Sequence, residues 1–184
     1  AHQDAAGIDL IGGQLMPGKD FPQSWYGSPN GDGEFYHYGI AKLASSAAHI
    51  APGKQGRSFC EVFAVYGDIA GSRLRKFVYD HLLVNGINEM IPAPPFIPGA
   101  DAEHCRKENA YVNRLCHLMH RTKPVIRAAV LYHAEAEWYG GDFDRFQAVG
   151  RVLAQRQISY DVIPADVFED VELYRTDMES GLTV

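Results

Sequence analysis

The stretch RSFCEVFAVYG, residues 57–67, places a single carboxylate inside an otherwise apolar, β-prone run. Its density of aromatic and β-branched residues predicts a strand covered on both faces, as in parallel sheets. Because burying an unpaired carboxylate costs several kcal/mol, Glu61 must be paired, neutralised or set where the strand is exposed. We therefore expect a functional role for Glu61. The structural alternative is that Glu61 ends the strand and pairs with Arg57 or Arg73.

Outside this stretch, the chain has the composition of an ordinary globular protein. It has 184 residues, enough for one sizeable domain or two small ones, and 46% of them are hydrophobic. A net charge of -6 and the lack of any Lys/Arg run argue against nucleic acid or an anionic membrane as a partner. No run approaches the ~18 to 20 apolar residues of a membrane span, and the first residues lack a signal-peptide pattern. We expect a soluble, cytoplasmic protein with neutral or small partners.

The cysteines and the first residues add two expectations. Cys60, Cys105 and Cys116 form no CxxC pair and are odd in number, which argues against a disulfide framework and predicts reduced thiols. The chain begins without Met and runs almost at once into an apolar strand, so we expect a fragment of a larger protein. A truncated sheet leaves strand edges and apolar surface uncovered, which predicts either self-association, as in a homo-oligomer, or poor order in residues 1–35.

β-prone runs alternate with helical patterns along the chain. The expected strands lie near residues 8–15, 57–65, 87–91, 125–132 and 158–163. The expected helices lie near residues 36–50, 71–86, 109–121 and 144–156, and a further one begins near residue 169. Strands that are each followed by a helix predict a parallel sheet or barrel of the α/β class. A change of composition at residues 122–124 predicts a boundary, with a hinge near Lys123-Pro124 and a fresh βαβ unit beyond it.

A dense cluster of turn residues over residues 16–33 predicts a long loop with a functional role. It contains Trp25 and Tyr26, whose rings offer flat surfaces of the kind on which sugar rings stack. The alternative is that these aromatic side chains pin the loop onto its own domain. We place both residues among the candidates for substrate binding.

Four segments in a fixed order carry a family resemblance. They are IGGQLMPG (11–18), FCEVFAVYG (59–67), LLVNGIN (82–88) and AVLYHAEAEW (129–138). Together they resemble barrel-type glycoside hydrolases in which a (β/α) barrel is followed by a flavodoxin-like domain, as in the bacterial β-galactosidases with a trimerisation domain. The resemblance implies the C-terminal part of a TIM-type barrel in residues 1–122 and the start of a flavodoxin-like βαβ domain in residues 123–184.

The resemblance also implies a reaction. Glu61 matches the carboxylate at the end of the seventh barrel strand, where retaining enzymes of this group keep their nucleophile. Their acid/base carboxylate lies on the fourth strand, which would be upstream of Ala1, so the chain alone is expected to be inactive. The implied partners are a carbohydrate substrate and the missing N-terminal part of the same barrel, with no cofactor. The second domain would serve packing or oligomerisation.

Three further polar residues are candidates for substrate binding. Gln14, at the mouth of the first strand, could hydrogen-bond a sugar hydroxyl or satisfy the turn at Met16-Pro17. Asn88, in the third strand, could bond a ligand or the backbone. Tyr66 lies in the same stretch as Glu61 and completes the set.

Other functions stay open from the residues alone. A complete small α/β protein of flavodoxin-like or amidotransferase-like type could use Cys60 as a nucleophile, but neighbouring strand residues point to opposite faces, which would aim Cys60 and Glu61 apart. A carbohydrate-binding or assembly module would use the aromatic loop without chemistry. No phosphate-binding loop supports a nucleotide. The pattern His133-x-Glu135-x-Glu137 suggests a metal site only if its strand continues, and two glycines end it soon after.

Overall fold

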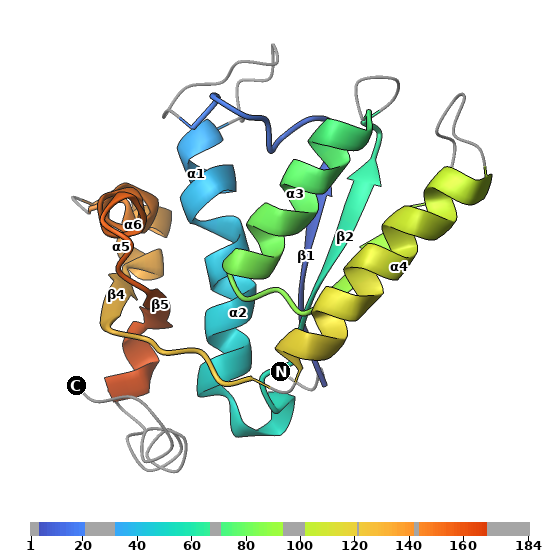
Figure 1. Cartoon of the computed structure of the whole chain (residues 1–184). Coiled ribbons are helices and arrows are strands. Elements are labelled where there is room, and N and C mark those ends of the chain that lie inside the picture. The colour runs from blue at the N-terminus through green and yellow to red at the C-terminus, as the bar shows by residue number, and fades with distance from the viewer. Residues whose placement is uncertain are drawn as a thin grey trace.

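The computed structural model describes residues 4–20, 32–66, 71–93, 102–120, 122–141 and 144–168 (Figure 1). The described chain is α/β, and its strands form two separate sheets in which every pairing is parallel. This agrees with the class predicted from the alternation of strands and helices. Within the described ranges, every helix is too short or too polar to cross a membrane. Cys60, Cys105 and Cys116 are free thiols, as predicted.

The first sheet has its strands in sequential order. They are β1 (Ala6–Ile11), β2 (Ser58–Ala64) and β3 (Glu89–Pro92). β2 lies in the centre and pairs in parallel with both neighbours. β1 ends earlier than predicted because Gly12 and Gly13 adopt φ values of 55° and 74°, a left-handed conformation that glycine reaches without steric penalty.

Each strand of this sheet is followed by helical structure. The helices are α1 (Gly33–Tyr38) and α2 (Ile40–Ile50) after β1, α3 (Ser72–Val84) after β2, and α4 (Ala102–Met119) after β3, with a short 3-10 turn, η1 (Pro52–Lys54), before β2. The single helix predicted for residues 36–50 is interrupted at Gly39. A Cβ at this position would lie 2.9 Å from the carbonyl oxygen of Phe35, so the break requires glycine.

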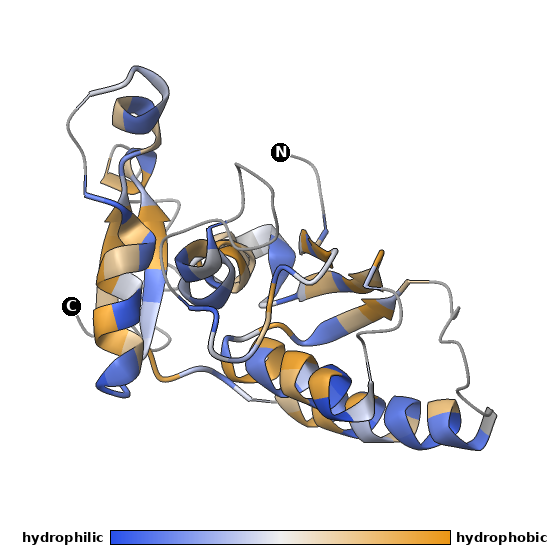
Figure 2. Cartoon of the chain, turned by 90° about the horizontal axis from the view of Figure 1, so that it is seen from above, coloured by the Kyte–Doolittle hydropathy of each residue, from blue (hydrophilic) through white to orange (hydrophobic). Residues whose placement is uncertain are grey.

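The helices that follow β1 and β2 cover the same face of the sheet. One cluster of buried side chains joins Leu10, Cys60 and Val62 of the strands to Ala44 of α2 and Leu82 of α3. Seen from above, the long helix α4 also runs along one side of the sheet (Figure 2). The hydrophobic core therefore lies between one sheet face and these helices.

The opposite face of the sheet is not covered by any described element. Gly7, Asp9 and Ile11 of β1 are exposed, and Phe59 and Glu61 of β2 are half-buried. The prediction that the Glu61 strand is covered on both faces is therefore wrong for the described part of the chain. The apolar character of β2 comes from the face that packs against the helices.

The second sheet is formed by β4 (Ala128–Tyr132) and β5 (Tyr160–Pro164), which pair in parallel. Between them lie α5 (Ala134–Trp138) and α6 (Phe146–Gln155), and the short η3 (Ala165–Phe168) follows β5. The predicted βαβ unit is confirmed. α5 is an addition to the prediction, since the HAEAEW segment leaves the strand and forms a helical turn. Residues 122–127 connect the two sheets without helix or strand.

Helices α1 and α2 lie between the two sheets (Figures 1 and 2). The carboxylate of Asp161 on β5 is fully buried and lies 3.2 Å from Oγ of Ser46 and 3.0 Å from Nδ1 of His49, both on α2. Tyr160 donates a hydrogen bond of 2.6 Å to the carbonyl oxygen of Tyr38 on α1. These buried polar contacts fix the second sheet against α1 and α2, which argues against a free hinge near Lys123-Pro124.

Candidate functional site

The uncovered face of the first sheet carries two carboxylates side by side. Asp9 on β1 and Glu61 on β2 are register partners, and Ile91 of β3 is the next residue across. Because adjacent strands lie ~4.8 Å apart, the two carboxylates are lateral neighbours on one face. Glu61 does not end its strand, since β2 continues to Ala64. It is accommodated within an apolar strand because its side chain faces the uncovered side.

Neither carboxylate takes part in an ion pair among the described residues. Arg57, which the sequence offered as a partner for Glu61, instead contacts Glu89, with 2.8 Å between Arg57 Nε and Glu89 Oε1. Arg73 forms no ion pair with Glu61 within those ranges either. Within the described ranges, the carboxylates of Asp9 and Glu61 are thus left to interact with solvent or with a ligand.

The aromatic ring of Phe59 lies on this face of the sheet, next to the two carboxylates. Phe59 lies two residues before Glu61 on the same side of β2, and its ring crosses over Gly7 of β1. A Cβ on Gly7 would lie 2.1 Å from Cζ of Phe59, so the ring can occupy this place only beside glycine. Exposed apolar side chains of Ile11 and Ile91 flank the carboxylates. The site therefore combines two carboxylates that form no ion pair among the described residues with apolar neighbours on both sides.

The strand becomes irregular at Phe63, two residues after Glu61. Phe63 and Val65 have φ values of 72° and 59°, which are rare and unfavourable for residues with a β-carbon and especially for β-branched valine. By alternation Phe63 should share the face of Glu61, but it is buried in the core. There its ring packs edge-on against Tyr79, with 5.0 Å between the two ring centroids. Such irregularities are enriched at barrel rims and beside active sites, where they redirect side chains.

Gln14 fixes the turn that leaves β1. Its Oε1 accepts a hydrogen bond of 2.9 Å from the backbone N–H of Ile11, and its Nε2 donates one of 2.9 Å to the hydroxyl of Tyr36. Gln14 therefore has a structural role, but it satisfies the turn at Gly12-Gly13 and not the turn at Met16-Pro17 that the sequence analysis considered. The residue still lies at the carboxyl end of β1, at the rim of the candidate site, and remains only half-buried.

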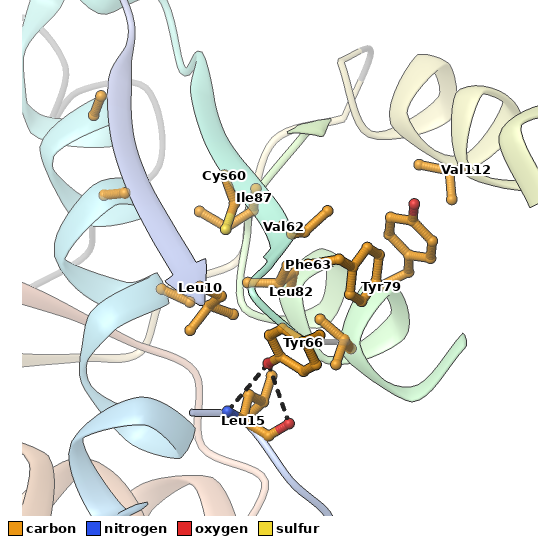
Figure 3. Close-up of a cluster of buried hydrophobic side chains, with 14 of the residues drawn as sticks. Leu10, Leu15, Cys60, Val62, Phe63, Tyr66, Tyr79, Leu82, Ile87 and Val112 are labelled. Carbon is orange, nitrogen blue, oxygen red and sulfur yellow. Dashed lines mark hydrogen bonds between the residues drawn. The ribbon is translucent and has the colours of Figure 1, made fainter. Parts of the chain in front are cut away.

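Tyr66 belongs to the core rather than to the uncovered face, contrary to its place among the candidates for substrate binding. Its hydroxyl lies 3.3 Å from the backbone nitrogen and 3.5 Å from the carbonyl oxygen of Leu15 (Figure 3). Burial raises the pKa of this hydroxyl to about 12. Tyr66 therefore joins the end of β2 to the segment after β1, and its ring is packed among apolar side chains.

Asn88 is likewise a structural residue, and its proposed contact with substrate must be corrected. Its Oδ1 accepts a hydrogen bond of 3.0 Å from Ser58 N–H, and its Nδ2 donates one of 2.7 Å to the carbonyl oxygen of Gly56. Both partners lie at the start of β2, whereas the rim formed by Gln14 lies beyond the end of β1. The amide is occupied in holding the strands together at the opposite end of the sheet.

Two alternative chemistries find little support in the described residues. Cys60 is fully buried on the helix-covered face, and burial raises the pKa of its thiol to about 12, which opposes the thiolate that a nucleophile needs. His133, Glu135 and Glu137 fall at the start of α5 and within it, and the described part of the chain contains no group of three residues suited to hold a metal ion. Trp25 and Tyr26 lie outside the described residues.

The sequence did not single out Asp9, Gly7 or Phe59. Their importance depends on the register that places Asp9 opposite Glu61 and Gly7 opposite Phe59. The alternation of the β1 run does place Gly7 and Asp9 on one face, and this was the only available signal. Comparison with known families, with curated proteins and with solved structures found no match to this chain.

Proposed function

We propose that this chain supplies the last strand–helix units of a (β/α) barrel in a retaining glycoside hydrolase, with Glu61 as the catalytic nucleophile. The observation that carries the proposal is the position of Glu61. It is unpaired among the described residues and half-buried, and it lies in register with Asp9 on the uncovered face of a parallel sheet. In a barrel, one face of each strand meets the helices and the other faces the interior, where catalytic side chains are carried towards the carboxyl ends of the strands.

The topology of the first sheet supports a barrel rather than a doubly wound sheet. The strand order is sequential, β1-β2-β3, and every pairing is parallel. Right-handed crossovers that always step in the same direction place their helices on one face, as in a barrel, whereas a doubly wound sheet has helices on both faces. The shared core of α2 and α3 corresponds to the first arrangement.

The apolar residues of the uncovered face support the same proposal. Ile11 is 40% exposed and Ile91 is 51% exposed. In a complete barrel these side chains would pack against the remaining strands. The free edges of β1 and β3 would pair with the same strands, because a closed barrel has no edges.

The proposed reaction is a double displacement. The Glu61 carboxylate attacks the anomeric carbon and forms a covalent glycosyl-enzyme, while an acid/base carboxylate elsewhere in the barrel protonates the leaving oxygen and later activates water. Retention requires these two carboxyl groups about 5 to 5.5 Å apart on opposite sides of the scissile bond. Asp9 lies beside Glu61 on the same sheet face, so we assign it to hydrogen bonding of sugar hydroxyls rather than to acid/base catalysis.

The remaining parts take supporting roles in this proposal. Trp25 and Tyr26 would stack on the sugar rings, and Gln14 would shape the rim. The β4–α6–β5 unit is interpreted as the start of a flavodoxin-like domain that serves packing or oligomerisation. The coding sequence upstream of Ala1 tests the barrel directly, because it should contain an in-frame barrel half with an Asn-Glu pair after a strand.

The decisive experiment is Glu61→Gln in the complete protein. Removing the nucleophile without changing its shape should lower turnover of an aryl glycoside on the order of 10³-fold or more while sugar binding survives. Glu89→Gln is the matched control, because Glu89 lies on the same sheet but is paired with Arg57. Near-normal turnover by Glu61→Gln would reject the assignment and favour a carbohydrate-binding module without chemistry.

A chemical rescue separates a missing nucleophile from a distorted site. Glu61→Gly leaves space for a small anion, so added azide or formate should restore part of the cleavage of an activated glycoside. The product should be a glycosyl azide of inverted configuration, since the anion attacks from the side that Glu61 occupied. No rescue, together with unchanged sugar affinity, would argue that Glu61 acts in some other way.

A further inference from the structure

Three consecutive residues of α1 hold the segment that follows β1. The hydroxyl of Tyr36 accepts a hydrogen bond from Gln14, His37 Nε2 donates one of 2.9 Å to the carbonyl oxygen of Met16, and the hydroxyl of Tyr38 donates one of 2.7 Å to Asp20. Successive helical side chains point about 100° apart. Residues 14–20 must therefore wrap around the end of α1, and the position of this segment depends on the position of the helix.

Residues 14–20 also border the candidate site. The segment begins directly after the turn that ends β1, and Leu15 within it is fully buried against Tyr66, two residues beyond the end of β2. It therefore lies across the carboxyl ends of the two strands that carry Asp9 and Glu61. A shift of this segment changes the rim of the site without touching either carboxylate.

α1 has only six residues and is too short to hold its own position. Glu34 of α1 and the N-cap residue Asp32 are both bound by the second βαβ unit. Glu34 is fully buried, with its carboxylate 3.1 Å from Nη2 of Arg145 and 3.0 Å from Nε of Arg151. Asp32, which caps α1 through the N–H groups of Glu34 and Phe35, also accepts a hydrogen bond of 3.2 Å from Gln147 on α6.

We propose that Arg145 and Arg151 are positioning residues for the rim of the site, acting through α1 on residues 14–20. Removing these guanidinium groups leaves Glu34 as a buried carboxylate without a counter-charge. α1 must then move to bring Glu34 into contact with water. That movement displaces Tyr36, His37 and Tyr38 and releases the segment they hold. The second βαβ unit thus holds α1, and through α1 residues 14–20, in place. We call this chain of contacts the brace. The effect on catalysis rests on the proposed function, but the effect on the segment does not.

Hydrogen exchange measured by mass spectrometry tests the brace in the full chain. In Arg145→Met/Arg151→Met, exchange of residues 14–20 and 32–38 should rise by about tenfold or more, while residues 58–64 of β2 keep the parent rate. Arg156→Met is the matched control, because Arg156 caps the same helix and contacts only the carbonyl oxygen of Val152 on α6 in the described structure. It should leave all three segments unchanged. Parent-like exchange of residues 14–20 in the double variant would overturn the proposal.

A second variant keeps the test decisive if the double variant unfolds as a whole. Tyr160→Phe removes only the hydrogen bond to Tyr38 on α1 and leaves no buried charge unpaired. It should raise exchange selectively in residues 14–20 and 32–38. If exchange rises equally in β2, or does not rise at all, α1 does not link the second βαβ unit to residues 14–20.

Kinetics of the complete protein add a readout that separates the brace from the proposed function. The arginine variants should raise KM several-fold for a glycoside while the pH profile of kcat keeps its shape, since Glu61 is not displaced. Arg151→Lys, which keeps the positive charge, should restore part of the affinity. If Glu61→Gln retains activity, the proposed function fails, yet the exchange result still decides whether the brace exists.

Discussion

Glu61 in β2 and Asp161 in β5 are both lone carboxylates in apolar strands, but their structural outcomes are opposite. Glu61 in β2 is half-buried on an uncovered sheet face and has no ion-pair partner among the described residues. Asp161 in β5 is fully buried and surrounded by polar partners on α2. The pattern alone therefore does not distinguish a functional carboxylate from a structural one.

The difference arises from what packs on each face. α2 covers the face of β5 that carries Asp161, and it supplies Ser46 and His49 as direct partners together with the nearby ammonium group of Lys42. Burial lowers the pKa of Lys42, while the charge of Asp161 opposes that shift. Ser46 also accepts a hydrogen bond of 2.8 Å from the backbone N–H of Val162, which orients its hydroxyl towards Asp161. No described element covers Glu61 on β2 in this way, and its carboxylate has no ion-pair partner in that part of the chain.

The largest effect on stability is expected at Asp161, the buried carboxylate of this pair. Asp161→Asn removes the charge that His49 and Lys42 face, and it should lower the free energy of unfolding by about 3 to 5 kcal/mol, as for other broken buried pairs. Urea denaturation followed by circular dichroism measures the change. A loss below about 1 kcal/mol would mean that this interface holds the second sheet far less firmly than its burial indicates.

A pH effect of similar size is expected from His37 on α1, which is buried, and His81 on α3, which is half-buried. Burial lowers the pKa of His81 to about 4, and burial also lowers the pKa of His37, whose ring lies 5.5 Å from that of His81. Both groups bind protons more readily in the unfolded chain. The contribution of these two histidines to the free energy of unfolding should therefore be fully present above pH 6.5. It should be lost as the pH drops towards 4, and the loss should be about 3 kcal/mol for His81.

Urea denaturation at pH 7 and pH 4.5 measures this dependence. His81→Gln should flatten the slope, since glutamine does not titrate in this range. His133→Gln is the control, because His133 is exposed and should not alter the slope. An unchanged slope in His81→Gln would assign the acid sensitivity to other groups.

A smaller effect is expected beneath the carboxylates of the uncovered face. Gly7→Ala places a methyl group where the ring of Phe59 lies, so overpacking should cost about 1 to 3 kcal/mol of stability. Phe59→Leu in the same chain should recover part of the loss, because leucine leaves room for the methyl group. Thermal denaturation of the two single variants and the double variant gives the coupling energy. Additive losses would show that the ring does not rest on Gly7.

The sequence predicted the elements well because each depends on local information. β-prone apolar runs located every described strand, and the Gly12-Gly13 turn bounds β1. The interruption at Gly39 was missed because a glycine within a helical pattern is usually tolerated. What packs on each face could not be predicted, since Ser46 and Asp161 are 115 residues apart in the chain.

The candidate site was predicted only in part for the same reason. Glu61 was found because a carboxylate in an apolar run is locally anomalous, whereas Asp9 became significant only through the register of β1 and β2. Tyr66 and Asn88 are polar residues at plausible positions, but their hydrogen bonds to the backbone of Leu15, Ser58 and Gly56 depend on how loops and strands meet. Sequence reasoning identifies unusual residues more readily than it identifies their partners.

The smallest effect on stability is expected at Glu61 itself. Like charges directly opposite each other on neighbouring strands are destabilising, so Glu61→Gln should leave stability unchanged or raise it by roughly 0.2 to 0.5 kcal/mol. Asp9→Asn should do the same, and the double variant should gain less than the sum, because either substitution alone removes the repulsion. The gains should shrink between low and high salt, since exposed charges are screened. A loss above about 1 kcal/mol for Glu61→Gln would place Glu61 with Asp161 as a structural carboxylate, and the proposed function would then lose its main support.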